Sequence, residues 1–222
     1  MKQKLSIIKI GGNIIEDQEF LSQFLKLFAQ LEGNKILVHG GGKRATEFGK
    51  RLGIESKMVD GRRITDAKSL ELVVMVYAGL VNKNIVAELQ SNNSNAIGLS
   101  GADANTVIAV KRPVNPLDFG LVGDIVHVNT NSISKLLSAE FVPVFCALTH
   151  DRNGQLFNTN ADTIASEVAI AMSRAYDTTL YYCFEKKGVL RSVTDEDSVI
   201  RKIDQKIYKK LKKDKIVADG ML

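Results

Sequence analysis

The sequence contains few cysteines, few prolines and no tryptophan. Cys146 and Cys183 are the two cysteines among 222 residues, and each lies inside an apolar run without C-x-x-C spacing. This usage excludes a disulfide framework and indicates reduced thiols in the core of a cytosolic protein. With three prolines and neither repeats nor low-complexity stretches, the chain has the composition of an ordinary globular protein.

Long hydrophobic runs are also missing. The longest spans residues 72–81, about half the length that a membrane-spanning helix needs. The N-terminal stretch MKQKLSIIKIGG lacks the apolar region of a targeting signal, because Lys9 interrupts it. We therefore expect a cytoplasmic protein with no membrane partner.

Acidic residues are slightly outnumbered. The 30 Lys and Arg against 25 Asp and Glu give a net charge of +5. Many of the basic residues gather in a Lys-rich helix that we predict over about 203–214. A solvated surface helix explains such a cluster better than nucleic acid does, so we expect no nucleic-acid partner.

Two short apolar runs open the chain, and glycines and a helical pattern follow each of them. The run 4–10 ends at Gly11-Gly12 before a helix predicted over 17–32. The run 35–39 ends at the glycines 40–42 before a helix predicted over 43–53. This alternation predicts a parallel sheet with helices on its faces.

The remaining elements continue this α/β pattern. Helices are predicted over 66–91, 131–139 and 161–174, and strands over 95–99, 106–112, 121–128, 142–148 and 178–184, with a hairpin over 150–158. The strands 106–112 and 121–128 are expected to form an antiparallel pair. Because the helix 66–91 is apolar around most of its circumference, it must be buried in its own core or against another subunit.

The segment VHGGGKR (38–44) fits several anion-binding loops. An esterase oxyanion loop would need a G-x-S-x-G elbow elsewhere, and in GLSG the glycine after Ser100 comes one residue too early. A P-loop would need Gly and Ser or Thr where Leu37 and Arg44 stand. Neither class fits this sequence.

A dinucleotide fingerprint fits better. Gly40-x-Gly42-x-x-Ala45 follows a predicted strand and precedes a helix, and Asp60 lies twenty residues after Gly40, where a ribose-binding acid is expected. The strand leading to Asp60 is very short, so a dinucleotide-dependent oxidoreductase stays open as an alternative.

The two glycine turns together predict an anion site. If their strands are adjacent, the N–H groups of Gly11, Gly12, Gly41 and Gly42 converge, and two helix N-termini point at one place. Lys9, near the end of an otherwise apolar strand, would direct its ammonium to the same point. The alternative is a lysine that extends to the rim of the sheet.

Five motifs, IKIGG, VHGGGK, GRRIT, NTNAD and DGM, occur in this order, and with them the sequence resembles the amino-acid kinase superfamily over essentially its whole length. The resemblance is strongest to the N-acyl-L-glutamate kinases of arginine biosynthesis. It implies an α/β fold, a three-layer α/β/α sandwich with a mainly parallel central sheet. The N-terminal lobe, 1–175, would bind the acylglutamate and form a homodimer through helix 66–91, and the lobe 176–222 would bind ATP.

The resemblance also implies the reaction. The γ-phosphoryl group of ATP passes to the side-chain carboxylate of an N-acyl-L-glutamate, giving an acyl phosphate. Mg²⁺ is bound through the nucleotide phosphates, so no residue is assigned as a metal ligand. Lys9 and the amides of Gly12 and Gly42 would stabilise the moving phosphoryl group, and Asp162 would orient the catalytic lysines.

Substrate and nucleotide contacts follow from the same resemblance. Gly41 and Gly42 would line the reacting end of the substrate, and Arg63 would clamp its α-carboxylate in a bidentate pair. Asn158 would hold the acylated head, with Asn160 nearby. The residues implied for ATP are Lys9, Gly11, Gly12 and Gly188, and Lys186 is added to them as a hypothesis of our own. Without the resemblance, Asn160 and Asp162 fit a helix cap and first turn, and Arg63 a solvated loop.

The sequence departs from the family pattern in two places. It ends at DGML, before the family's second catalytic lysine, so we expect a truncated C-terminal lobe and a fragment of a longer product. Phe184-Glu185 replaces the usual Ser-Asp, and Lys186 or Lys187 is expected to take over part of the phosphate binding. A non-catalytic acylglutamate-binding relative therefore stays open, and no motif specifies an acetyl or a succinyl group.

Overall fold

The computed structural model describes residues 2–59, 61–184, 186–192 and 194–213. Its centre is a sheet of five parallel strands, as the sequence predicts. Their order across the sheet is β11 (Asp177–Cys183), β1 (Lys4–Ile10), β2 (Asn34–His39), β8 (Val142–Phe145) and β5 (Ala96–Leu99). The two strands that end in glycine turns are neighbours, with Ile10 opposite His39.

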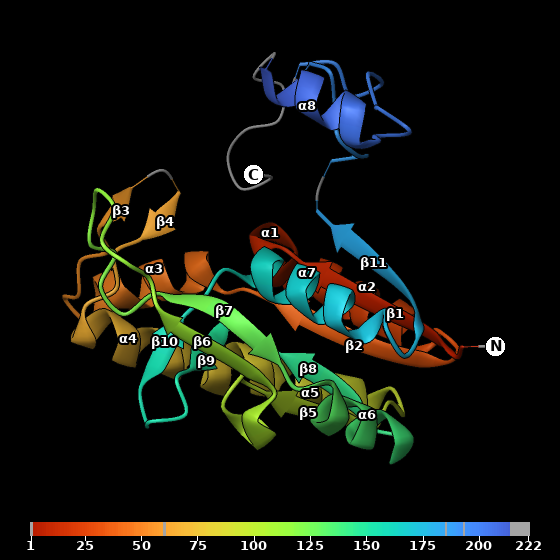
Figure 1. Cartoon of the computed structure of the whole chain (residues 1–222), viewed down its shortest axis with the longest axis horizontal. Coiled ribbons are helices and arrows are strands. Elements are labelled where there is room, and N and C mark those ends of the chain that lie inside the picture. The colour runs from red at the N-terminus through yellow and green to blue at the C-terminus, as the bar shows by residue number, and fades with distance from the viewer. Residues whose placement is uncertain (1, 60, 185, 193, 214–222) are drawn as a thin grey trace.

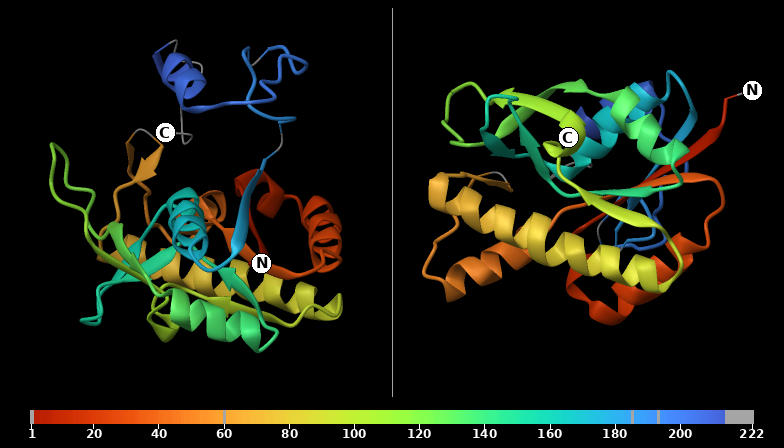
Figure 2. Two further views of the ribbon diagram at one scale, coloured as in Figure 1. Left: turned by 45° about the vertical axis from the view of Figure 1, so that its right-hand side comes forward. Right: turned by 90° about the horizontal axis from the view of Figure 1, so that it is seen from below.

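Helices cover both faces of this sheet (Figure 1, Figure 2). One face carries α1 (Gly12–Glu16), α2 (Gln18–Ala29), α3 (Gly42–Arg51) and a long helix that begins at Ala67. The other face carries α6 (Thr130–Ser138) and α7 (Ala161–Met172), which contacts β1 and β11. The predicted three-layer α/β/α sandwich is confirmed.

The long helix runs unbroken in the right-hand view of Figure 2. It consists of α4 (Ala67–Val73), a π-helical segment (Val74–Val81) and α5 (Asn82–Ser91). Asp66 caps it by accepting a hydrogen bond from the N–H of Ser69. The helix predicted over 66–91 is confirmed, but the sequence did not indicate the π-helical turns. The helix is long and apolar enough to cross a membrane, but core helices of soluble proteins share this length and composition. Of its most apolar stretch, 44% is buried in the protein.

A second sheet lies against α7. It contains β10 (Leu156–Asn158), β9 (Leu148–His150), β6 (Val107–Lys111) and β7 (Gly123–Val128), in that order. The predicted antiparallel pairings, β6 with β7 and β9 with β10, are both present. A small hairpin of β3 (Met58–Val59) and β4 (Arg62–Arg63) precedes the long helix.

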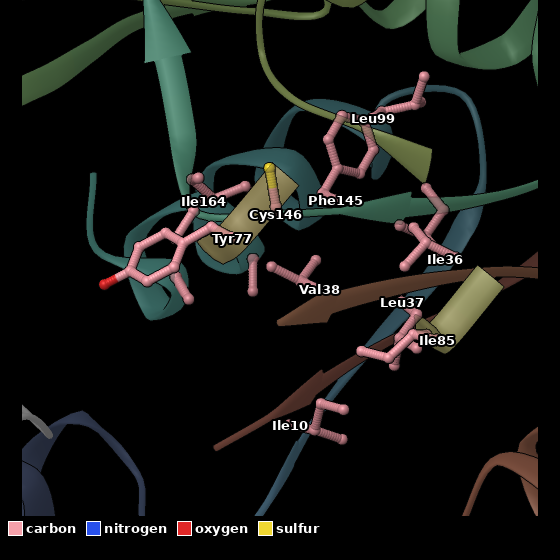
Figure 3. Close-up of a cluster of buried hydrophobic side chains, with 14 of the residues drawn as sticks. Ile10, Ile36, Leu37, Val38, Tyr77, Ile85, Leu99, Phe145, Cys146 and Ile164 are labelled. Atoms are coloured by element: carbon pink, nitrogen blue, oxygen red, sulfur yellow. The ribbon is translucent and has the colours of Figure 1, made fainter. Parts of the chain in front are cut away.

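The core fills the space between the central sheet and its helices. Figure 3 shows side chains from β2 meeting Ile85 of the long helix and Phe145 of β8. Cys146 is fully buried in this core, whereas Cys183 is half-buried, and both thiols are free. The prediction of core thiols is therefore correct for Cys146 and only partly correct for Cys183.

Beyond β11 the chain leaves the sandwich. The segment with α8 (Gln205–Lys213) lies apart from both sheets in Figures 1 and 2. β11 itself pairs with β1 along its whole length. The division at 175/176 stays a prediction, and Asp60, Glu185 and DGML lie outside the described residues.

Candidate active site

The two glycine turns lie side by side at the carboxyl ends of β1 and β2. Helix α1 begins at Gly12 and α3 at Gly42, so both helix N-termini open at this edge of the sheet. The first turn is close to the start of α3, since Cδ of Lys43 lies 3.5 Å from the position that a Cβ on Gly12 would take. Unpaired N–H groups and the positive ends of helix dipoles favour an anion at such a place.

Lys9 extends from β1 toward α7 rather than to the rim of the sheet. Its Nζ lies 2.8 Å from Oδ1 of Asp162, and the two side chains are 15% and 31% exposed. The same ammonium is beside the first glycine turn, 3.6 Å from the position of a Cβ on Gly11. Lys9 and Asp162, both predicted site residues, are therefore brought together next to the paired turns.

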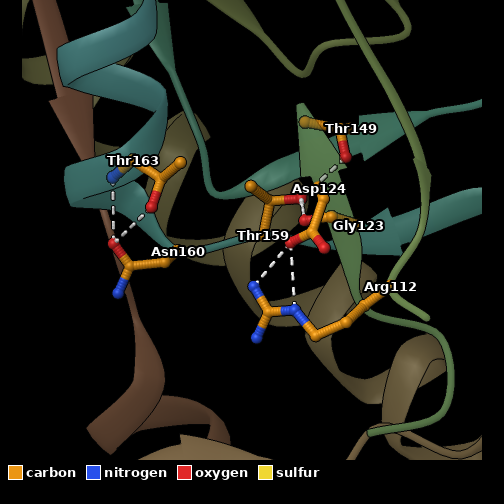
Figure 4. Close-up of polar contacts among 7 residues, drawn as sticks. All are labelled: Arg112, Gly123, Asp124, Thr149, Thr159, Asn160 and Thr163. Atoms are coloured by element: carbon orange, nitrogen blue, oxygen red, sulfur yellow. Dashed lines mark hydrogen bonds and ion pairs between the residues drawn. The ribbon is translucent and has the colours of Figure 1, made fainter. Parts of the chain in front are cut away.

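Asp162 owes its position to the start of α7. Asn160 caps this helix by accepting a hydrogen bond from the N–H of Thr163 at 3.0 Å (Figure 4). Asp162 follows in the first turn, where the helix dipole favours a carboxylate. The capping interpretation of Asn160 is thus confirmed, while its role near a substrate stays a prediction.

Arg63 is buried, not solvated. The β3–β4 hairpin holds its guanidinium against α3, where Nη2 donates to the carbonyl of Gly42 at 3.1 Å and to Oγ1 of Thr46 at 2.8 Å. Nη1 donates to Oγ of Ser56. Nε is buried and has no hydrogen-bond partner among the described residues. The interpretation of Arg63 as a loop residue in solvent is wrong, because the sequence does not reveal how the hairpin folds back.

Asn158 is connected to Arg63 through one buried threonine. Nδ2 of Asn158 donates to Oγ1 of Thr65 at 3.0 Å, and that hydroxyl donates to the carbonyl of Arg63 at 3.3 Å. The backbone of Thr65 also pairs with the loop before β7, since its carbonyl accepts from Leu121 at 2.6 Å. The side chains of Asn158 and Thr65 and the backbone of Arg63 therefore form one connected wall beside the second glycine turn.

Two buried polar residues at this site were not predicted. His39, at the end of β2, donates from Nδ1 to the carbonyl of Gly40 at 2.7 Å and accepts at Nε2 from Asn82 at 2.9 Å. Burial lowers the pKa of His39 to about 4, so the ring is neutral. No local pattern marks Asn82, because its partners lie 43 and 62 residues away in the chain.

The predicted nucleotide residues beyond β11 lie apart from the turns. Lys186 forms an exposed ion pair with Glu196 at 3.3 Å, and Lys187 one with Asp197 at 2.9 Å. Gly188 follows directly in the same segment of the chain. Within the part of the chain that the structure describes, no cluster of three His, Cys, Asp or Glu side chains could hold a metal ion.

Comparison with known proteins shows which family this chain is similar to. The model of the amino acid kinase family matches residues 4–222. The chain belongs to the amino acid kinase family. A protein of Cytophaga hutchinsonii named acetylglutamate kinase is 58% identical over 99% of this chain and 84% of its own length. Another of that name, from Phocaeicola vulgatus, is 54% identical over 100% of this chain and 86% of its own length.

A solved structure agrees with this membership. A crystal structure from Streptococcus mutans UA159 superimposes with a TM-score of 0.80 at 26% identity, covering 98% of this chain and 85% of that one. The paired turns and the contact between Lys9 and Asp162 are present in this chain, while the roles of these residues in the reaction stay predictions. The dinucleotide alternative receives no support from these comparisons.

Proposed function

We propose that the chain transfers the γ-phosphoryl group of ATP to the side-chain carboxylate of an N-acyl-L-glutamate, giving an acyl phosphate in arginine biosynthesis. The names of the two relatives at 58% and 54% identity support the substrate class. The observation that carries the proposal is the ion pair of Lys9 and Asp162 beside the paired glycine turns. A cytoplasmic location is inferred with it.

The chemistry requires positioning and charge neutralisation more than covalent catalysis. The amides of Gly12 and Gly42 and the ammonium of Lys9 offer positive charge at one point, where the phosphoryl group would move between anionic oxygens. Asp162 would hold the ammonium in place through its ion pair and would form no bond to the substrate or the nucleotide. Gly11 would let the phosphates approach the backbone, and Gly41 would line the reacting carboxylate with its backbone.

The acylglutamate would lie on the side of the second turn. Arg63 there has one buried donor, Nε, that finds no partner in the part of the chain that the structure describes, which suits a bound carboxylate. Because Nη2 already makes two protein hydrogen bonds, a bidentate grip would require one of these bonds to be exchanged. Asn158 would contact the acylated head through the wall that it shares with Thr65.

ATP would supply the phosphoryl group, with Mg²⁺ neutralising its phosphates. Lys9, Gly11 and Gly12 would contact the phosphates, and Lys186 and Gly188 would contribute from the segment after β11. The first glycine turn and the segment after β11 are connected through the end of β11. Its last residue, Cys183, accepts a backbone hydrogen bond from Gly11 at 3.3 Å.

We also infer a homodimer that forms through the long helix. Its π-helical segment carries Met75 and Leu80, which are 54% and 39% exposed although both are large and apolar. Met75→Glu is expected to reduce the mass in light scattering to that of a monomer. Val110→Glu, at an equally exposed position on β6, serves as the control. A wild-type protein that is already monomeric would contradict the inference.

Hydroxylamine trapping tests the function directly. The purified protein is incubated with MgATP, hydroxylamine and either N-acetyl-L-glutamate or N-succinyl-L-glutamate. Formation of the hydroxamate from one of them is the expected result, and it also identifies the acyl group. Binding of an acylglutamate by calorimetry without any hydroxamate would instead favour the non-catalytic relative.

A further inference from the structure

Tyr77 lies directly beneath the second glycine turn. Its ring packs so closely on Gly41 that an added Cβ would lie 2.7 Å from Cδ1, and its hydroxyl is 3.7 Å from the position of a Cβ on Gly42. Figure 3 shows the ring beside Cys146 and Ile164, with the hydroxyl directed away from the other labelled side chains. The ring of Tyr77 packs in the core, and its oxygen lies at the site.

The hydroxyl is available as a donor. Burial raises the pKa of Tyr77, and the neighbouring charge and hydrogen-bonding groups of Arg63 offset part of this rise. The phenol therefore stays protonated at neutral pH. Since a guanidinium donates and cannot accept, Arg63 does not take up the phenolic proton, and no other described residue is hydrogen-bonded to it.

Two donors thus lie at the same glycine. Arg63 is 6% exposed, its Nε has no partner among the described residues, and its Nη2 donates to the carbonyl of Gly42. The hydroxyl of Tyr77 lies at Gly42 too, 3.7 Å from the position of a Cβ there. A buried donor without an acceptor is costly in a folded protein, so Nε of Arg63 indicates a missing acceptor. A carboxylate, which accepts at two oxygens and carries the charge opposite to Arg63, is the group that satisfies both.

We propose that Tyr77 is a substrate-binding residue whose hydroxyl donates a hydrogen bond to the α-carboxylate of the N-acyl-L-glutamate beside Arg63. The inference rests on the proposed function for the identity of the substrate. The π-helical segment that carries Tyr77 agrees with it, since such turns are frequent at functional sites. Tyr77 then supports the glycine turn with its ring and selects the substrate with its oxygen.

Tyr77→Phe tests the hydroxyl alone, because the ring and its contact with Gly41 remain. The Kd for N-acetyl-L-glutamate, measured by calorimetry, and the KM in the hydroxamate assay are expected to rise about tenfold, as for the loss of a hydrogen bond to a charged group. The kcat and the KM for ATP should stay within about twofold. Tyr181→Phe, at a half-exposed position on β11, is the matched control and should change nothing.

A substrate analogue without the α-carboxylate, 4-acetamidobutanoate, separates the hydroxyl's role from general damage to the pocket. The wild type should bind it more weakly than N-acetyl-L-glutamate, and Tyr77→Phe should bind it as the wild type does. Should the variant not fold, tyrosine fluorescence of the wild type gives the answer, since the chain has five tyrosines and no tryptophan. N-acetyl-L-glutamate should quench this emission by hydrogen bonding to a carboxylate, and the analogue should not.

The outcomes distinguish the two proposals. Equal Kd values for Tyr77→Phe and the wild type, or quenching that does not depend on the α-carboxylate, would overturn the role of Tyr77 and leave the kinase activity standing. A Kd that depends on Tyr77 without any hydroxamate would support Tyr77 and overturn phosphoryl transfer. A wild type that binds no N-acetyl-L-glutamate would overturn both.

Discussion

Asn82 donates a hydrogen bond to Nε2 of His39 at 2.9 Å, in the interior of the protein and directly below the glycines of the second turn. The same amide nitrogen donates to the carbonyl of Val144 on β8 at 2.9 Å. Asn82 also occupies the space that a side chain at position 98 would need, so β5 has a glycine there. The end of β2 is therefore tied to the long helix and to β8 by one side chain.

This relationship predicts that stability depends on pH. His39 has a pKa of about 4 when folded against about 6.5 when unfolded, so the unfolded state binds the proton more tightly. The contribution of neutral His39 to the free energy of unfolding is complete above pH 6.5. It is lost as the pH is lowered toward 4, by up to about 3 kcal/mol. Protonation also turns Nε2 into a donor facing the donor of Asn82. Urea unfolding at a series of pH values measures the effect.

The control separates His39 from the acidic groups that titrate in the same range. His39→Gln should flatten the curve between pH 6.5 and 5, whereas His127→Gln, at an exposed position on β7, should leave it unchanged. Parallel curves for the wild type and His39→Gln would contradict the assignment.

Gly41→Ala is expected to destabilise the protein by about 1–3 kcal/mol, as overpacking in a core does. The new Cβ would lie 2.7 Å from the ring of Tyr77, which other core residues hold in place. Gly40→Ala is the matched control in the same turn, since its Cβ would meet only Cβ of Ala161 at 3.9 Å. Thermal unfolding of the two variants should differ by several degrees, and equal Tm values would argue against the contact.

Lys9→Met is expected to lower kcat about 10²–10³-fold, because it removes a positive charge from the point of phosphoryl transfer. Methionine keeps most of the apolar length of the lysine side chain, so the fold and the Kd for N-acetyl-L-glutamate should change little. Lys4→Met, on the same strand but exposed, should retain full activity in the hydroxamate assay. Activity of Lys9→Met within a few fold of the wild type would remove Lys9 from the mechanism.

Lys35→Met is expected to lower the free energy of unfolding by about 1–3 kcal/mol, because it removes hydrogen bonds from the end of α2. Nζ of Lys35 donates to the carbonyls of Ala29 and Leu31 at 2.7 and 2.8 Å, and these carbonyls lose their partner in the variant. Lys26→Met, on the exposed surface of the last turn of α2, should change the free energy of unfolding by less than about 0.5 kcal/mol. Urea denaturation compares the two, and an equal loss in both would contradict the capping role.

The parts of the site that were predictable from the sequence depend on local order. Strand, glycine turn and helix follow one another within a few residues around Gly11 and Gly41, and parallel pairing then brings the turns together. The family motifs added Asp162, whose ion pair with Lys9 joins residues far apart in the chain.

The other parts depend on packing between distant segments. Tyr77 reads as one more apolar position in the run 72–81, and nothing near it indicates that its ring lies under Gly41. The burial of Arg63 depends on a two-residue hairpin that folds onto α3. The sequence indicated His39 only as a structural residue, and Asn82 was overlooked, because a buried, neutral pair leaves no pattern of charge or spacing in the sequence.

The π-helical segment has a consequence for helical phase. Residues five apart in an α-helix differ by about 140° in direction, so Tyr77 and Asn82 would point to different neighbours. Here the N–H of Asn82 reaches the carbonyl of Tyr77, the i to i+5 bond of a π turn, which brings the two residues close to the same heading. One helix thus supports the turn at both ends, under Gly41 and at His39. A regular α-helix of the same sequence would instead keep the two residues five apart in α-helical phase and rotate one of these supports away.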